Sequence, residues 1–263
     1  MFMQGRTSPP ATLTQPWRLP AQGLAVFHGE CDAPRLSHYF LPRLALEGKR
    51  ILFLDGANSA NPRLMARLAE RRGLPFAQIS RQIKIARAFT CFQLTELIRR
   101  VPQFLADFPA EVLIVTAFPE LYFDEDVRDA DAQAAFRQAL GLLRRWTLTG
   151  GDGGQDEIRN SKLEIRNSVS PSRVSNFGFR VSSFAQPLAL GHPPVTVALF
   201  STVSGFQPPP GRKFFFTQTC AAAAEIWKFQ VDEHERLALM RQDKVLGLGA
   251  GDWGKPKLEN RNS

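Results

Sequence analysis

The stretch LAVFHGECDAPRLS, residues 24–37, decides which fold we expect for this chain. It opens with an apolar run typical of a buried strand, and the run reaches Gly29. Pro34, a residue favoured in the first turn of a helix, follows after four more residues. The stretch therefore predicts a strand, a loop and a helix, which is the repeating unit of α/β proteins.

The same stretch has the layout of a phosphate-binding loop without most of its chemistry. Such a loop cradles phosphates with backbone N–H groups, a lysine and a hydroxyl that holds Mg²⁺. Here Pro34 has no N–H, Leu36 has no oxygen, and only Arg35 keeps a positive charge. We therefore treat Gly29, Glu30 and Arg35 as a vestigial phosphate loop.

Composition is typical of one globular α/β domain. The 263 residues are 44% hydrophobic, and 33 basic against 25 acidic residues give a net charge of +8. This charge allows an anionic partner such as nucleic acid without establishing one. Cys31, Cys91 and Cys220 form no C-x-x-C pair, so we expect a reduced, cytoplasmic setting and no zinc site. No apolar run approaches the length of about 18 residues that spans a bilayer, so we expect no membrane partner.

Composition also divides the chain. Residues 1–22 are rich in Pro, Thr and Gln and predict a mobile tail. The α/β core is expected at 23–149 and 188–232, interrupted by a disordered, low-complexity insertion at 150–187. Residues 233–263 are expected to end a hairpin and form a disordered tail.

Within the core, apolar runs alternate with helical patterns, which favours a mostly parallel sheet buried on both faces. We expect strands at 24–28, 50–54, 82–86, 112–116, 194–202 and 212–216. We expect helices at 34–47, 61–72, 91–107, 127–147 and 221–227, and a hairpin after Trp227.

The insertion repeats short phrases: EIRNS (157–161) precedes KLEIRNS (162–168), and KLENRNS (257–263) echoes it. One hypothesis is a translated inverted DNA repeat, because the opposite strand of such codons can spell a phrase close to SNFGFRVSSF (175–184). The alternative is an ordinary linker rich in Ser and Asn.

Two further motifs carry a family resemblance. NPRL (61–64) lies within the strand-to-helix stretch 52–74, and ARAFT (86–90) lies within 83–94. Together with the Gly-Glu pair at 29–30, they resemble the RecA-like ATPase superfamily, with the archaeal and eukaryotic recombinases and KaiC-like proteins as the nearest branch. The resemblance implies a RecA-like P-loop NTPase fold, with a mostly parallel, twisted sheet and helices on both faces.

The resemblance also indicates which positions would carry the catalytic residues. In this chain, residues of other types stand at those positions. The phosphate-loop lysine and threonine fall on Arg35 and Leu36, and the acid that positions water falls on Ala57. The Walker B aspartate falls on Thr116, and a polar sensor falls near 201–202. Because phosphoryl transfer depends on the lysine and Mg²⁺, we expect no hydrolysis, no catalytic or metal-binding residue, and no cofactor. Binding of ATP with Mg²⁺ stays an open alternative.

Other candidates have two interpretations each. Asp55 ends a strand where α/β ligands usually bind, but it could instead bond the following turn. The acids at 124–126 could hold a cation or could form the start of the next helix. His28 and His38 flank the loop without a nucleophile at a suitable spacing, so packing is the better interpretation.

A nucleic-acid contact is also open. In the family, the loops after the Walker B strand and the next strand face DNA. The second loop offers Phe206 for stacking and Arg212 and Lys213 for phosphates. A Pro-rich turn with a solvated basic end explains the same residues.

These observations favour a non-hydrolytic RecA-like protein. It would serve as an accessory or regulatory subunit in DNA recombination or repair, through contacts with a paralogous RecA-like subunit or with itself. The alternatives are an ATP-binding protein or weak ATPase, and a decaying gene product without activity.

Overall fold

The computed structural model describes residues 18–29, 32–148, 194–202, 210–231 and 237–242. The predicted insertion at 150–187 lies outside the described residues, and so do Glu30, Cys31, Phe206 and most of both predicted tails. Residues 18–22 are the described end of the first tail, and there Leu19 packs against one of the hydrophobic cores.

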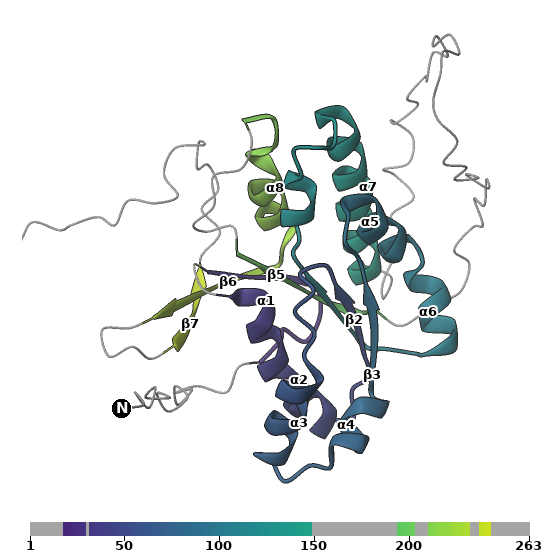
Figure 1. Cartoon of the computed structure of the whole chain (residues 1–263), viewed down its shortest axis with the longest axis vertical. Coiled ribbons are helices and arrows are strands. Elements are labelled where there is room, and N and C mark those ends of the chain that lie inside the picture. The colour runs from purple at the N-terminus through teal and green to yellow at the C-terminus, as the bar shows by residue number, and fades with distance from the viewer. Residues whose placement is uncertain (1–17, 30–31, 149–193, 203–209, 232–236, 243–263) are drawn as a thin grey trace, which may run out of the picture.

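A seven-stranded sheet organises the described part of the chain, in the order β3-β2-β4-β5-β1-β6-β7 (Figure 1). Neighbouring strands are parallel except for the last pair, in which β7 runs antiparallel to β6. The strands are β1 (Leu24–Gly29), β2 (Ile51–Asp55), β3 (Ile83–Arg87), β4 (Val112–Thr116), β5 (Thr196–Ser201), β6 (Glu225–Val231) and β7 (Leu237–Gln242).

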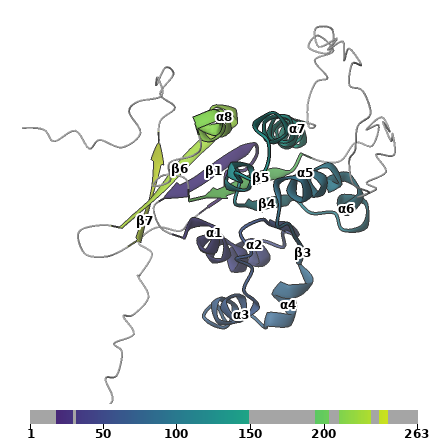
Figure 2. The same ribbon diagram turned by 45° about the horizontal axis from the view of Figure 1, so that its top comes forward.

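Helices cover both faces of this sheet (Figure 2). One face carries α5 (Cys91–Arg99), α6 (Val101–Asp107), α7 (Asp129–Leu148) and α8 (Phe214–Ala222). The other carries α1 (Ala33–Leu36), α2 (Leu41–Leu46), α3 (Pro62–Glu70) and α4 (Phe76–Arg81). Single 3₁₀ turns are η1 (Ser37–Phe40), η2 (Glu120–Phe123) and η5 (Pro210–Arg212).

Two hydrophobic cores explain why the central strands are apolar along most of their length. Every residue of β1, β2, β4 and β5 is buried. Because side chains alternate along a strand, Val26 packs in the core beneath α5–α8, whereas Phe27 packs in the core beneath α1–α3. The predicted α/β class, with a mostly parallel sheet and helices on both faces, is confirmed. The more specific RecA-like fold stays a prediction.

Local signals set the helix boundaries. Asn61 and Thr90 accept hydrogen bonds from the third following backbone N–H and cap α3 and α5. The predicted helix at 91–107 is two helices, since Pro102 cannot donate the hydrogen bond that would continue the first. The predicted helix at 34–47 contains the 3₁₀ turn η1.

Two predictions near the end of the core are wrong. The expected strand at 212–216 contributes to η5 and α8, because Phe215 stacks on Phe123 and Phe136 of the same face and needs helical geometry to do so. The expected helix at 221–227 contains only the end of α8, and β6, which extends the parallel sheet beside β1, begins within it at Glu225. The predicted hairpin after Trp227 is confirmed by the antiparallel pairing of β6 and β7.

Candidate functional site

The carboxyl edge of the sheet, where the six parallel strands end, brings most predicted site residues together. The register aligns Asp55 of β2 with Thr116 of β4, and Thr116 with Phe200 of β5. Ser201 of β5 in turn lies beside His28, one residue before Gly29. This edge is where open α/β sheets usually bind ligands.

The loop after β1 presents an acid where a phosphate would lie. Asp32 caps α1, and its side chain accepts a hydrogen bond of 3.3 Å from the backbone N–H of Arg35. Pro34 is buried in the first turn, whereas the Arg35 side chain is exposed and forms no ion pair among the described residues. A carboxylate at a helix N-terminus occupies the donors and repels an anion. Asp32 therefore already accepts a hydrogen bond from one of the N–H groups at the start of α1.

His38 joins this loop to the start of α3. Its Nδ1 lies 2.9 Å from the carbonyl oxygen of Arg35, and its Nε2 lies 3.1 Å from the backbone N–H of Asn61. A carbonyl can only accept and an amide can only donate, so Nδ1 carries the proton and Nε2 accepts. Burial lowers the pKa of His38 and keeps the ring neutral. His38 is thus a structural link, as the packing interpretation expected.

Asp55 serves the turn that follows β2. Its Oδ1 accepts hydrogen bonds from the backbone N–H of Ser59 at 2.9 Å and from the hydroxyl of Thr116 at 3.1 Å. Its Oδ2 accepts one from the backbone N–H of Ala60 at 2.9 Å and lies 3.5 Å from Nε of Arg87. The side chain is fully buried. Asp55 therefore bonds the turn that follows its strand, which is the second of the two interpretations given above.

Thr116 and Ala57, where the resemblance places two catalytic acids, contact one another. The backbone N–H of Ala57 donates to the Thr116 hydroxyl at 3.2 Å. The approach is tight, because a Cβ added to Gly56 would lie 2.5 Å from the Thr116 carbonyl oxygen. At these two positions the chain therefore has a backbone N–H bonded to a hydroxyl, with no carboxylate.

Glu120 has a buried carboxylate oxygen, and the sequence predicted no structural role for it. Its Oε1 accepts hydrogen bonds from the backbone N–H of Thr202 and, at 3.1 Å, from the Thr202 hydroxyl. Its Oε2 is buried and has no hydrogen-bond partner among the described residues. Burial raises the pKa of Glu120, against the hydrogen bonds from Thr202 that lower it. The available signal was an acid inside the apolar segment AFPELYF (117–123).

Arg212 is a clamp in the interior. The residue is 2% exposed, and its guanidinium bonds the Asp129 carboxylate at 2.8 Å and the carbonyl oxygen of Tyr122 at 3.3 Å. It also donates to the carbonyl oxygens of Asp124 and Val127. The guanidinium therefore does not face solvent, and the predicted phosphate contact of Arg212 loses its basis.

Of the other two residues of the predicted nucleic-acid contact, the structure describes Lys213. Lys213 is exposed and lies over the ring of Phe214, with its Nζ 5.0 Å from the ring centroid. Phe206 falls outside the described residues. Only Lys213 keeps a position that a phosphate could reach.

The acids at 124–126 form a turn before α7. The backbone N–H of Asp126 donates to Oδ1 of Asp124 at 3.0 Å. The acids of the first helical turn are instead Asp129 and Asp131. Within the described ranges, no three His, Cys, Asp or Glu side chains are grouped to hold a metal ion. Of the helices described, none has both the length and the apolar character to cross a bilayer.

Comparison with known proteins adds no family to this picture. No family model matches the chain, and no curated protein sequence matches it. The resemblance to RecA-like ATPases rests on the motifs quoted above and stays a prediction. What the structure establishes is an α/β protein with a mostly parallel sheet, in which Asp55 at the carboxyl edge bonds the following turn and Thr116.

Proposed function

We propose that this protein is a non-hydrolytic relative of the RecA-like ATPases that acts through protein contacts, as an accessory subunit in DNA recombination or repair. One observation carries the proposal. At the carboxyl edge, Asp55 and Thr116 bond each other and the adjacent turn, while Asp32 caps the loop after β1. The polar groups of this edge hold the fold together and leave little for a nucleotide.

The chemistry of phosphoryl transfer supports the same conclusion. The reaction needs a cation on the phosphates, a metal ligand and an acid that orients water. The corresponding positions are Arg35, Leu36, Thr116 and Ala57. Removing one such group typically lowers a rate by about 10²–10³, so the joint loss predicts no turnover.

An exposed apolar edge supplies a surface for protein contacts. In the described sheet, β3 pairs with β2 alone, so its other side presents unpaired backbone groups. Ile85 on this strand is 39% exposed, and Phe89 and Phe92 just after it are 64% and 50% exposed. Apolar side chains gathered beside an open strand favour pairing with another chain. The partner we propose is a paralogous RecA-like subunit or a second copy of this chain.

Two measurements test the proposal. An ATPase assay with Mg²⁺ should give no turnover above a buffer control, and measurable turnover would sink the non-hydrolytic assignment. Light scattering of the full chain, alone and mixed with a RecA-like ATPase from the same genome, should detect a complex. The double variant Phe89→Ser, Phe92→Ser should weaken that complex, whereas Phe214→Ser, an exposed Phe on α8, should not. Equal effects of both variants would argue against the β3 edge.

The alternative of nucleotide binding rests on Arg35, which is exposed and forms no ion pair within the described ranges. Calorimetry with ATP and Mg²⁺ separates the two functions. The alternative expects heat that Arg35→Ala abolishes, whereas the proposal expects none. A cytoplasmic location accompanies either function as a prediction. Decay of the gene is less consistent with buried polar groups such as Asp55 and Arg212 that are fully engaged.

A further inference from the structure

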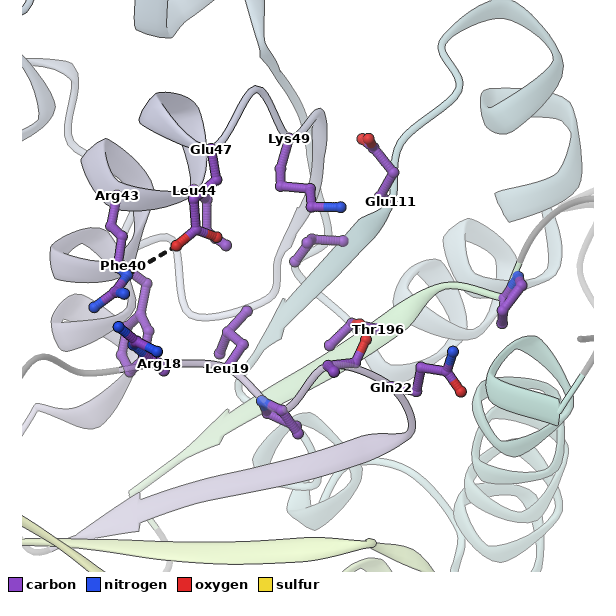
Figure 3. A pocket seen from close by; sticks show the side chains of 14 residues that line it. Arg18, Leu19, Gln22, Phe40, Arg43, Leu44, Glu47, Lys49, Glu111 and Thr196 are labelled. Atoms are coloured by element: carbon purple, nitrogen blue, oxygen red, sulfur yellow. Dashed lines mark hydrogen bonds and ion pairs between the residues drawn. The ribbon is translucent and has the colours of Figure 1, made fainter.

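A second site candidate lies at the opposite edge of the sheet, where β4 and β5 begin. A cavity of about 540 Å³ lies there, within the range of small-molecule sites, and Figure 3 shows the side chains that line it. Phe40, Leu44 and Val112 line it with buried apolar side chains, and Leu19 of the N-terminal segment closes one side. The cavity therefore offers an apolar floor of the size of a small organic molecule.

The acids of this cavity are already engaged. Oε1 of Glu47 accepts a hydrogen bond of 2.9 Å from Nε of Arg43, which also lines the cavity. Oε2 of Glu111 accepts one of 2.7 Å from the backbone N–H of Arg50. Arg43 therefore compensates the charge of Glu47, whereas the partner of Glu111 is a neutral amide and Glu111 keeps its negative charge.

Two cations of the cavity have no such partner. Arg18 and Lys49 line it and form no ion pair among the residues that the structure describes. Figure 3 places the Lys49 ammonium and the Arg18 guanidinium at different sides of the space, one from the turn after α2 and the other from the N-terminal segment. The lining therefore has three cations, Arg18, Arg43 and Lys49, against two acids, Glu47 and Glu111, which is a net charge of +1.

The turn after α2 explains why Lys49 lies there. Gly48 has a φ of +74°, and its N–H donates to Ala45 while the N–H of Lys49 donates to Leu44. This is the Schellman arrangement, in which the residue after the glycine usually makes an apolar contact with the helix. The same turn after α3 follows that rule, since Leu74 packs with Ala69. After α2, the residue that follows the glycine is Lys49, which lines the cavity.

We propose that this cavity binds a small amphipathic organic acid, whose apolar body lies on the floor and whose acidic group pairs with Lys49 and Arg18. This ligand would lie at the amino edge of the sheet, where β4 and β5 begin. The proposal goes beyond the function above and does not rest on it, because none of these residues belongs to the carboxyl edge or to β3.

A pair of naphthalene probes tests the proposal on the full chain. The anionic probe is 8-anilinonaphthalene-1-sulfonate, and the neutral probe is N-phenyl-1-naphthylamine, which has the same rings without the sulfonate. We expect saturable fluorescence with the sulfonate. Lys49→Gln and Arg18→Gln should each raise its dissociation constant by about two- to fivefold, the range of exposed ion pairs, and should leave the neutral probe unchanged.

Two further variants control for charge and for space. Lys84→Gln removes the same charge from β3, where its ammonium lies over Phe104, and should not change either affinity. Gln22→Trp adds bulk at the exposed rim of the cavity and should weaken both probes. Thermal unfolding of each variant, compared with the unmodified chain, verifies that it is folded.

Competition identifies the chemistry of the ligand. Excess 1-naphthoate should displace the sulfonate probe, whereas inorganic phosphate at the same concentration should not. The proposal is overturned by the absence of saturable binding, by an equal effect of Lys49→Gln and Lys84→Gln, or by sulfonate binding that Gln22→Trp leaves intact.

Discussion

The Thr116 hydroxyl donates a hydrogen bond of 3.1 Å to Oδ1 of Asp55, and the two residues are register partners at the ends of β4 and β2. Both are fully buried. The RecA-like resemblance places the Walker B aspartate at the position of Thr116. Here the pair holds the turn after β2 against the sheet, so the polar groups act within the fold.

Replacing Asp55 should therefore destabilise the protein. Asp55→Ala leaves the buried N–H groups of Ser59 and Ala60 without acceptors, and we expect the free energy of unfolding to fall by about 3 kcal/mol. Asp55→Asn should also destabilise, since its amide would direct a donor at one of these donors. Urea denaturation measures the effect, with the exposed Asp107→Ala as the control. An unchanged or raised stability, as expected for an acid kept only for a ligand, would contradict this role.

Arg212→Lys should lower the free energy of unfolding, although it keeps the positive charge. A lysine cannot reproduce the fork that reaches Asp129 and the carbonyl oxygens of the 122–127 segment. We expect a loss of about 3 kcal/mol in the free energy of unfolding. Lys213→Ala changes an exposed neighbour and should stay within about 0.5 kcal/mol of the unmodified chain. Similar values for the two variants would refute the clamp.

The sequence predicted the central sheet well, because strands buried on both faces leave a strong local signal. The apolar run at 112–116 was predicted with the bounds that β4 has. The segment around Phe215 was not, since three consecutive phenylalanines favour a strand locally, whereas the helix depends on contacts distant in sequence, such as the stacking of Phe215 on Phe123 and Phe136.

The site was predictable in its positions but less so in its contacts. Motif spacing brought Asp55, Thr116 and the loop after Gly29 to one edge of the sheet, as found. The role of Arg212 could not be predicted, because its partners lie in a loop distant in sequence and a basic residue after prolines is usually solvated. The cavity beside Lys49 likewise depends on segments that meet only in the fold.

His38 should make the protein less stable in acid. Burial lowers its pKa below the ordinary value of 6.5, so the unfolded chain binds a proton more readily than the folded one. Its contribution is complete above the unfolded pKa and falls as the pH drops below it. Burial also lowers the pKa of His28, which likewise reduces stability in acid. Burial raises the pKa of Glu120, whose effect on stability therefore has the opposite dependence on pH.

The contribution of His38 is therefore measured as a difference. Stability should fall less between about pH 7.5 and pH 5.5 in His38→Gln than in the unmodified chain. Proton NMR of the imidazole should show a ring that stays neutral, with the proton on Nδ1, to a lower pH than an ordinary histidine. A titration at the ordinary value of 6.5 would contradict the buried link between Arg35 and Asn61.

Two glycine-to-alanine changes should have opposite signs. Gly48 has a φ of +74°, so Gly48→Ala should lower the free energy of unfolding by about 1 kcal/mol, although no atom lies within 4 Å of the added methyl. Gly141 lies inside α7 with equal space and an ordinary φ, and Gly141→Ala should raise stability by about 1 kcal/mol. Thermal denaturation separates the two. Because the turn at Gly48 also aims Lys49 at the cavity, Gly48→Ala should weaken the sulfonate probe, and Gly141→Ala should leave its affinity unchanged.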